Sequence, residues 1–172
     1  MTRLFVSDTS VLIELERASL LERAFALPFE FIVPDLLYKR ELQEEGGAAL
    51  IALGLAVAEL DADEVTLAQD YQSRAPNISL PDAFALVLAK TRAEALLTGD
   101  QNLRRLAEVE AVTCRGVLWV LDQMLAEGVA SAAELYHGLT AISRHARCRL
   151  PKSEMRTRRH SWAGAAGIVA ED

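Results

Sequence analysis

Short apolar segments of strand-like composition alternate with segments of helical periodicity along roughly the first 115 residues of this chain. The first of them, RLFVS at residues 3–7, ends at a run of polar residues, as a buried strand commonly does. Parallel strands need a long crossover between them, and a helix is the usual crossover. The alternation therefore predicts an α/β fold with a central parallel β-sheet flanked by α-helices. The expected strands are residues 3–7, 29–33, 55–60, 95–98 and 112–113.

Capping residues, prolines and glycines mark where the intervening helices begin and end. Asp61 is followed three residues later by Glu64, which is the spacing of a capping box. Ser79 stands two residues before Pro81, and a proline is well tolerated in the first turn of a helix. These signals predict one helix from Thr9 or Ser10, one over about 18–26, one from Pro34 to Gly46-Gly47, one over 48–54, one from Asp61 to about Arg74, one from Ser79, and one over 101–109.

Beyond residue 116 the alternation stops and only helical patterns remain. Residues 117–127 form an amphipathic segment that ends at Gly128, and Ser131 caps a second helix that reaches about residue 143. Two helices with a short connection predict a helical hairpin that packs on the sheet domain. We therefore expect three parts: a sheet domain over 1–115, a helical hairpin over 116–143, and a loosely ordered basic tail over 144–172.

The net charge of −7 hides a strong asymmetry between this tail and the rest of the chain. Residues 1–139 hold 11 basic and 22 acidic residues, whereas residues 140–172 hold 7 basic and 3 acidic residues. A basic tail on an acidic body indicates that the tail meets a negative surface: nucleic acid, a partner protein, or the body itself. A solvated tail without any partner is the alternative.

Hydropathy and cysteine content indicate the cellular compartment in which the protein is expected. The longest apolar run, residues 48–58, is too short to span a bilayer, and the apolar start of the chain is interrupted by Asp8 before it could form a secretory signal. Cys114 and Cys148 stand alone, without the spacing of a metal or redox motif. These features lead us to expect a cytoplasmic protein.

Four acidic residues stand where an expected strand ends or where an expected helix lies beside the same edge of the sheet. In parallel sheets this edge, at the carboxyl ends of the strands, is where ligands bind. Clustered carboxylates repel one another and need positive charge, which a hard divalent cation such as Mg²⁺ supplies with oxygen ligands. Such a cation can hydrolyse phosphodiesters. The four residues are Asp8, Glu41, Asp82 and Asp100.

Each of the four also has a purely structural interpretation. Asp8 could cap the following helix, Asp82 could stabilise the first turn of its helix, and Asp100 could serve as a turn residue. The expected helix that carries Glu41 also carries Glu44 and Glu45. We choose Glu41 because it shares a helix face with the apolar Leu37 and Tyr38, whereas its two neighbours run into the terminal glycines.

The ordered set of motifs resembles the PIN-domain family, and in particular its VapC-like toxins of toxin–antitoxin pairs. The motifs are a strand followed by D-T-S, then VPDLLYKREL, then LPDAFALVLA, then LLTGDQNL. The resemblance covers residues 3 to about 114, and the hairpin at 116–143 is similar to an extension found in a subgroup of these proteins. It implies the α/β fold of this family and a metal-dependent endoribonuclease that hydrolyses RNA.

The resemblance also implies roles for individual residues. Asp8, Glu41, Asp82 and Asp100 would hold one or two Mg²⁺ or Mn²⁺ ions, with Thr98, Asn102 and Ser10 in support. Many relatives have a further aspartate where this chain has Asn102, and this departure weakens the case for a second metal ion. A small antitoxin protein is the implied partner, and homodimers are common among such proteins.

Other interpretations of the acidic set remain open. Asp8 could be the nucleophile of a phosphoaspartyl mechanism, but Ser10 stands where the matching phosphatase motif requires a second aspartate. A binding module without activity could keep the same fold. If the protein does act on RNA, basic residues must offset its acidic body, and the candidates are Arg104, Arg105, Arg147 and Arg149.

Overall fold

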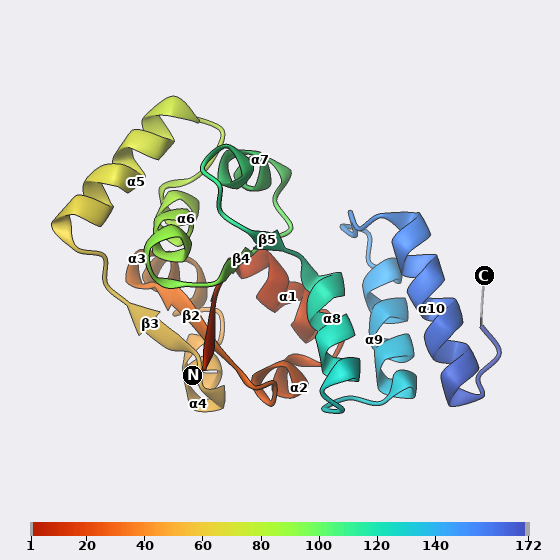
Figure 1. Ribbon diagram of the computed structural model, residues 1–172. Helices are drawn as coiled ribbons and strands as arrows, with labels where there is room; N and C mark the ends of the chain where they lie inside the picture. The colour runs from red at the N-terminus through yellow and green to blue at the C-terminus, as the bar shows by residue number, and fades with distance from the viewer. Residues whose placement is uncertain (1, 171–172) are drawn as a thin grey trace. The chain divides into compact units, whose positions relative to one another are not determined.

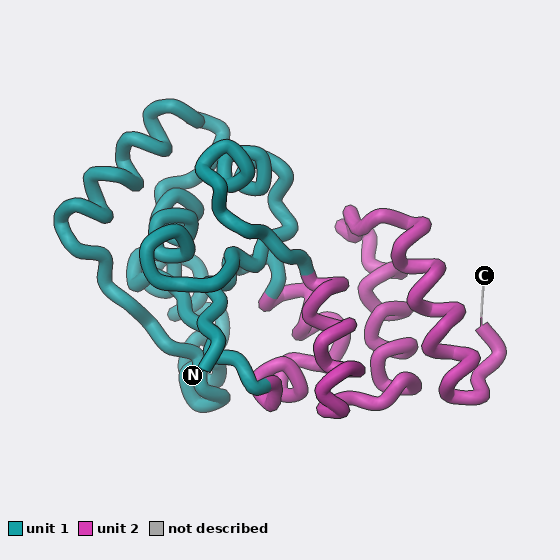
Figure 2. Tube along the Cα trace, in the orientation of Figure 1, with its two compact units in different colours: residues 1–11, 28–116 teal, residues 12–27, 117–172 magenta. Residues whose placement is uncertain are grey.

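The computed structural model describes residues 2–170 (Figure 1). The chain forms two compact units (Figure 2). Of the described residues, unit 1 contains those up to Val11 together with Pro28–Gly116, and unit 2 contains Leu12–Leu27 together with all residues from Val117 on. The first unit closes close to the expected boundary at residue 115. The assignment of residues 12–27 to the same unit as the C-terminal helices was not expected from the sequence.

A five-stranded parallel sheet forms the centre of unit 1. Its order is β3-β2-β1-β4-β5, so the first strand of the chain lies in the middle. This confirms the predicted α/β class, with its parallel sheet and flanking helices. The strands are β1 (Arg3–Ser7), β2 (Phe29–Pro34), β3 (Ala56–Ala58), β4 (Ala95–Leu97) and β5 (Cys114–Arg115).

The last strand begins two residues later than expected. Residues 111–112 finish the preceding helix α7 (Gln101–Val109): Ala111 adopts a left-handed φ of 59°, and the Val112 N–H donates to the Ala107 carbonyl at 2.8 Å. Such a closing bond satisfies a carbonyl at the helix end and takes these residues out of the sheet. The expected strand at 112–113 is therefore wrong in its position, although its existence is confirmed.

Helix α6 (Leu80–Arg92) packs directly on the sheet and contacts β1, β2 and β4. Its residues 83–89 are all buried, as their uniformly apolar composition predicts. Helix α5 (Ala62–Arg74) packs on α6 (Figure 1). The capping boxes expected at the starts of both helices are present, formed by Asp61 with Glu64 and by Ser79 with Asp82.

The helix expected from Pro34 to the paired glycines is shorter and less regular than predicted. It consists of one α-helical turn, α3 (Asp35–Leu37), followed by the π-helical turn η1 (Tyr38–Leu42). The Gln43 N–H donates to the Tyr38 carbonyl at 2.8 Å, five residues back, which is the bond of a π-helix. The next helix, α4 (Gly47–Leu53), starts at the second glycine, one residue before the expected start at 48.

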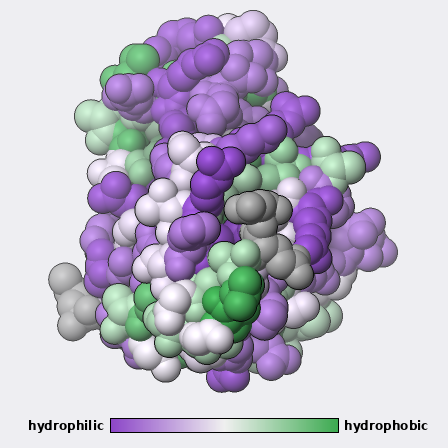
Figure 3. Space-filling view, turned by 90° about the vertical axis from the view of Figure 1, so that its right-hand side faces the viewer, coloured by the Kyte–Doolittle hydropathy of each residue, from purple (hydrophilic) through white to green (hydrophobic). Residues whose placement is uncertain are grey.

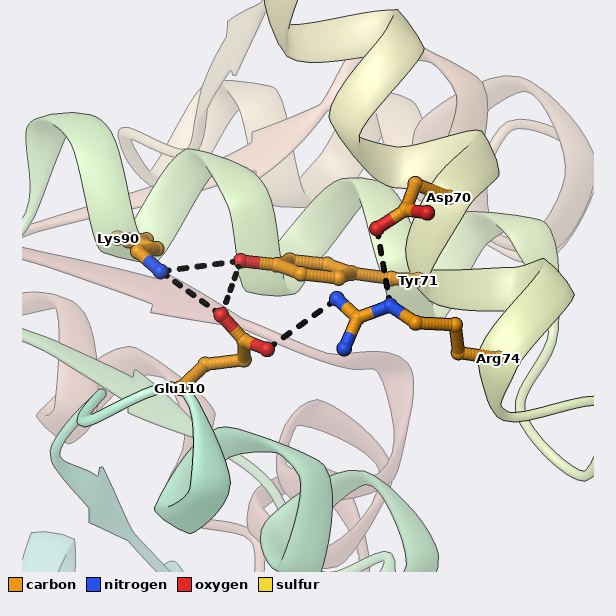
Figure 4. Close-up of polar contacts among 5 residues, drawn as sticks. All are labelled: Asp70, Tyr71, Arg74, Lys90 and Glu110. Carbon is orange, nitrogen blue, oxygen red and sulfur yellow. Dashed lines mark hydrogen bonds and ion pairs between the residues drawn. The ribbon is translucent and has the colours of Figure 1, made fainter.

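A polar cluster joins α5, α6 and the C-terminal end of α7 (Figure 4). The ring of Tyr71 is fully buried, and its hydroxyl donates to Glu110 Oε2 at 2.8 Å. Lys90 Nζ donates to the same carboxylate oxygen at 2.8 Å, while Arg74 approaches the other oxygen at 3.2 Å. These bonds hold the pKa of Glu110 well below its usual range, at about 2. The cluster therefore fixes the two helices on which Asp82 and the residues after Asp100 stand.

Replacing Glu110 with glutamine is expected to lower the free energy of unfolding by about 2 kcal/mol, because the buried Tyr71 hydroxyl and Lys90 lose a charged acceptor. Because the pKa of Glu110 is lowered in the folded protein, its carboxylate stabilises the fold fully above its ordinary pKa of 4.5. This stabilisation is lost as the pH falls towards about 2. Urea unfolding at pH 7 and at pH 3 measures both effects. As a control, Asp70→Asn removes only the exposed partner of Arg74 and should change little. A Glu110→Gln protein as stable as wild type at pH 7 would contradict the prediction.

The helices of unit 2 surround a separate core. Helix α1 (Thr9–Arg17) begins in unit 1 and continues into unit 2, where α2 (Leu21–Phe25) contacts α8 (Val117–Ala126). Contacts between α2 and α8 explain why residues 12–27 group with the C-terminal helices. Helices α8 and α9 (Ala132–Arg144) form the predicted hairpin, which the sequence signals at Gly128 and Ser131 located correctly.

The prediction of a loosely ordered C-terminal tail is wrong. Residues Lys152–Ala166 form a fifteen-residue helix, α10, which packs along α9. Met155, Trp162 and Ala163 recur at seven- and eight-residue spacing, so they lie on one side of the helix, and all three are buried. Because the segment is highly charged, this narrow apolar face was not recognised in the sequence. None of the described helices is long and apolar enough to cross a bilayer.

Candidate active site

The candidate site lies where the strand order of the sheet reverses. From the central β1 the chain first builds β2 and β3 on one side, and it then returns to build β4 and β5 on the other. In open parallel sheets, ligands bind at the carboxyl ends of the two strands that flank such a switch point. Here these strands are β1 and β4, and the Asp8 N–H joins their ends by donating to the Leu97 carbonyl at 2.9 Å.

Asp8 follows β1 directly, and the residue is only 3% exposed. Its carboxylate accepts three hydrogen bonds: from the Ser10 hydroxyl at 2.7 Å, from the Val11 N–H at 3.1 Å, and from the Thr98 hydroxyl. Burial nevertheless raises the pKa of Asp8 to about 6, and the negative charge of Asp82 adds to the increase, while the three hydrogen bonds oppose it. The bond from Val11 shows that Asp8 also caps α1, so its structural and functional interpretations are compatible.

Thr98 connects Asp8 to the turn after β4. It is completely buried; its hydroxyl donates to Asp8 and accepts the backbone N–H of Asp100 at 3.0 Å. Ser10 makes a second link, because its oxygen accepts the Gly99 N–H at 3.0 Å while its hydroxyl donates to Asp8. The carboxylate of Asp100 accepts the Leu103 N–H at 2.8 Å and so caps α7. Of the three predicted supporting residues, Thr98 and Ser10 are thus bonded to Asp8.

Glu41 approaches from the π-helical turn η1. Its Oε2 accepts the Thr9 hydroxyl at 3.0 Å, and Glu44 and Glu45 are exposed beyond it. Partial burial raises the pKa of Glu41; the Thr9 bond opposes this change and the charge of Asp82 adds to it. The sequence interpretation considered Thr9 only as a helix cap and missed this contact. Its position between Asp8 and Ser10 in the D-T-S motif was the one available signal.

A glycine holds this turn close to the next helix. A Cβ at position 47 would come within 2.7 Å of the Leu42 carbonyl oxygen and 2.8 Å of the Tyr38 ring, so Gly47 permits an approach that any other residue would prevent. The sequence interpretation treated Gly47 only as a helix terminator. In the structure it supports the turn that presents Glu41.

Asp82 lies in the first turn of α6, where its carboxylate accepts the Ser79 N–H at 3.3 Å. Its charge raises the pKa of both Asp8 and Glu41. These shifts indicate that the charge of Asp82 acts on the carboxylates of both Asp8 and Glu41. Asp100 joins the group through Thr98.

The donor chemistry of this group fits a hard divalent cation. Within residues 2–170, none of the four carboxylates forms a salt bridge with a lysine, arginine or histidine, so their negative charge has no protein countercharge. Oxygen donors of this kind suit Mg²⁺ or Mn²⁺. In the described part of the chain, however, no three acidic, histidine or cysteine side chains already converge closely enough to form a ligand set.

A family model described as PIN domain matches residues 4–162 of the chain, well over half of its length. The chain belongs to the PIN-domain family. Proteins with this domain are generally nucleases, and they typically use divalent metal ions. The match extends beyond the sheet domain through α8 and α9 and into α10, further than the resemblance found in the sequence. A search of curated proteins finds no match for the chain.

The arginines and the asparagine predicted near the site of this PIN domain occupy different environments. Arg104 donates from Nη2 to the Thr98 carbonyl at 2.9 Å, and its buried Nε has no hydrogen-bond partner in the described structure. It therefore braces the turn after β4 from within unit 1. Arg105 is exposed on α7, and Asn102 is partly buried in the first turn of the same helix. The remaining two predicted arginines, Arg147 and Arg149, are exposed between α9 and α10 in unit 2.

Proposed function

We propose that this PIN domain is a metal-dependent endoribonuclease that hydrolyses phosphodiester bonds of single-stranded or looped RNA. The observation that carries the proposal is the set of four carboxylates at the switch point of the sheet, none of which has a protein countercharge within residues 2–170. One of them, Asp8, is buried with a pKa raised to about 6. Perturbed carboxylates of this kind gather at functional sites.

In this proposal Asp8, Asp82, Asp100 and Glu41 hold Mg²⁺ or Mn²⁺. An ion bound there would supply positive charge to the phosphate and would lower the pKa of a water molecule that acts as the nucleophile. Asp8 is held in one orientation by the hydroxyls of Ser10 and Thr98. Such supporting bonds keep a ligand in place for its metal ion.

Glu41 has a second task in the proposed reaction. Its Oε2 is occupied by the Thr9 hydroxyl, which leaves Oε1 to accept a hydrogen bond from the attacking water. Thr9 is thereby a positioning residue for Glu41.

The proposed cellular role is that of the toxin in a type II toxin–antitoxin pair, acting in the cytoplasm. The resemblance to VapC-like toxins supports this role. An acidic site without countercharge would also attract an arginine or lysine from an antitoxin, for the same electrostatic reason that it attracts a metal ion. A short reading frame for a DNA-binding protein beside this gene, whose product restores growth after induction of this chain, would support it. Growth that is unaffected by induction would exclude the toxin role.

Cleavage should require a divalent ion. Purified protein incubated with a fluorescently labelled single-stranded RNA is expected to cut it in Mg²⁺ or Mn²⁺, and EDTA should stop the reaction because the carboxylates then repel the substrate phosphate. The Asp8→Asn protein, purified in parallel, controls for contaminating ribonuclease. Equal cleavage with and without EDTA would refute the metal-dependent reaction. Binding of RNA without any cleavage would favour a binding module.

A further inference from the structure

Residues 144–170 contain seven basic residues and one acidic residue. Arg144 is the last residue of α9, and the structure divides the other six into residues that fasten α10 to unit 2 and residues that face solvent. Such a division cannot be read from charge alone, because all of them lie within a short stretch of chain. It determines which of the positive charges are available to a partner.

Two arginines fasten the helix. Arg158 binds Asp122 of α8 through Nε at 2.9 Å and Nη2 at 2.7 Å, which is a bidentate pair. Arg159 donates to the Thr140 hydroxyl oxygen of α9 at 3.2 Å and lies over the ring of Tyr136, 5.7 Å from its centre. The charges of Arg158 and Arg159 therefore help to hold α10 against α8 and α9.

Four other basic residues are exposed, two on α10 and two in the connection before it. Lys152 and Arg156 are one helical turn apart and both are exposed, and the connection before them exposes Arg147 and Arg149. Within residues 2–170 none of these four side chains takes part in a salt bridge. We name them the outer basic surface: Arg147, Arg149, Lys152 and Arg156.

The chemistry of this surface fits a polyanion. Arginine binds phosphate in bidentate fashion, and several unpaired cations on a short segment can bind successive phosphates. A lipid surface fits less well, because the apolar residues Met155, Trp162 and Ala163 are buried, so that the helix has no exposed apolar face there to insert. Figure 3 shows one face of the molecule, which is mostly hydrophilic, with apolar residues gathered in a smaller area low on this face.

Because residues 1–139 are strongly acidic, a protein of this kind that cleaves RNA needs a separate positive surface to bind it. They carry 22 acidic and only 11 basic residues, so they repel a phosphate backbone. We propose that the outer basic surface binds the phosphate backbone of substrate RNA and supplies most of the salt-dependent affinity of this chain. This inference rests on the proposed ribonuclease function, whose substrate it would hold.

The test compares two double variants that each remove two positive charges from α10. Lys152→Gln with Arg156→Gln alters the outer surface, whereas Arg158→Gln with Arg159→Gln alters the fastening side. Binding of labelled single-stranded RNA is measured by fluorescence anisotropy at three salt concentrations, in the full chain carrying Asp8→Asn to prevent cleavage. Each phosphate contact on a single strand contributes about 0.7 to the slope of log affinity against log salt.

The outer double variant is expected to lower this slope by about 1.4 and to weaken binding at low salt roughly tenfold. Its melting temperature should equal that of the parent. In the chain with Asp8 intact, it should raise KM and leave kcat unchanged. The fastening variant should instead melt at lower temperature and, where folded, keep the parent slope.

The alternative outcomes separate this inference from the proposed function. RNA cleavage together with an unchanged slope in the outer variant would overturn the surface and leave the ribonuclease intact. Equal loss of slope in both folded variants would also overturn it, because total charge would then explain binding. A changed oligomeric state with unchanged RNA binding would assign the surface to a protein partner. RNA binding that depends on the outer residues without any cleavage would support the surface and refute the nuclease.

Discussion

Replacing Asp8 with asparagine is expected to reduce RNA cleavage by at least about 100-fold, since even the residues that only support a metal ligand typically contribute 10- to 100-fold. The same change should stabilise the protein in the absence of divalent metal. Asp8 is 3% exposed and its pKa is raised to about 6 from an ordinary value of 3.8, so the folded state bears the cost of a buried charge. A shift of this size corresponds to up to about 3 kcal/mol at pH 8, where the carboxylate is ionised in both states.

The sign of the pH dependence follows from the raised pKa. Between pH 6 and 3.8 the folded state binds the proton before the unfolded state does, so Asp8 makes the protein more stable as the pH falls through this range. Asparagine resembles the protonated form, and the Asp8→Asn protein should lack this part of the pH dependence. Urea unfolding at pH 8 and pH 5, with EDTA present, measures it.

A matched control and a metal titration complete the experiment. Glu30→Gln removes an exposed negative charge from β2 of the same unit and should change neither activity nor stability appreciably. Saturating Mg²⁺ should raise the melting temperature of wild type, because a ligand that binds only the folded state stabilises it, and this increase should be much smaller in Asp8→Asn. Full activity of the Asp8→Asn protein would refute the site. Equal stabilisation of both proteins by Mg²⁺ would remove Asp8 from the metal ligands.

Replacing Glu41 with glutamine is expected to lower kcat by about 100-fold or more, which is the usual contribution of a residue that positions or deprotonates the nucleophile. Glutamine keeps the size of the side chain and can still accept the hydrogen bond from Thr9. The loss would therefore report the missing charge and not a disturbed fold. Single-turnover cleavage of the labelled RNA at saturating protein measures the effect.

The same region of the chain supplies the controls. Glu44→Gln and Glu45→Gln remove exposed charges just beyond the π-helical turn and should behave like wild type. Thr9→Val removes the 3.0 Å bond to Glu41 and should lower kcat about tenfold without changing metal affinity greatly. Wild-type activity in Glu41→Gln combined with loss in Glu44→Gln or Glu45→Gln would show that a neighbouring carboxylate acts instead.

Local signals in the sequence determine several elements of unit 1. Capping boxes at Asp61 and Ser79 place the starts of α5 and α6, and the apolar run 83–89 identifies the helix that lies on the sheet. These capping signals involve residues within one helical turn of each other, so they do not require contacts between distant parts of the chain. The positions of Asp8 and Asp100 at strand ends follow from the same local patterns.

Other features depend on residues far apart in the chain, and only the tertiary structure decided them. The π-helical turn that carries Glu41 forms with Gly47 packed against it, and the hydroxyl that meets Glu41 comes from Thr9, 32 residues earlier. Thr98 reaches Asp8 only because β4 returns to pair with β1. No local pattern encodes such pairings, since strand order sets which side chains meet.

The C-terminal segment shows the same distinction in its charges. Its sequence alone determined that it is strongly basic, because charge is a property of each residue. Packing against α8 and α9 decided that it forms a helix, with Arg158 bound to Asp122 and Arg156 left exposed two residues away. Adjacent positions on a helix point in different directions, so two arginines of equal charge acquire different roles only when a partner covers one side.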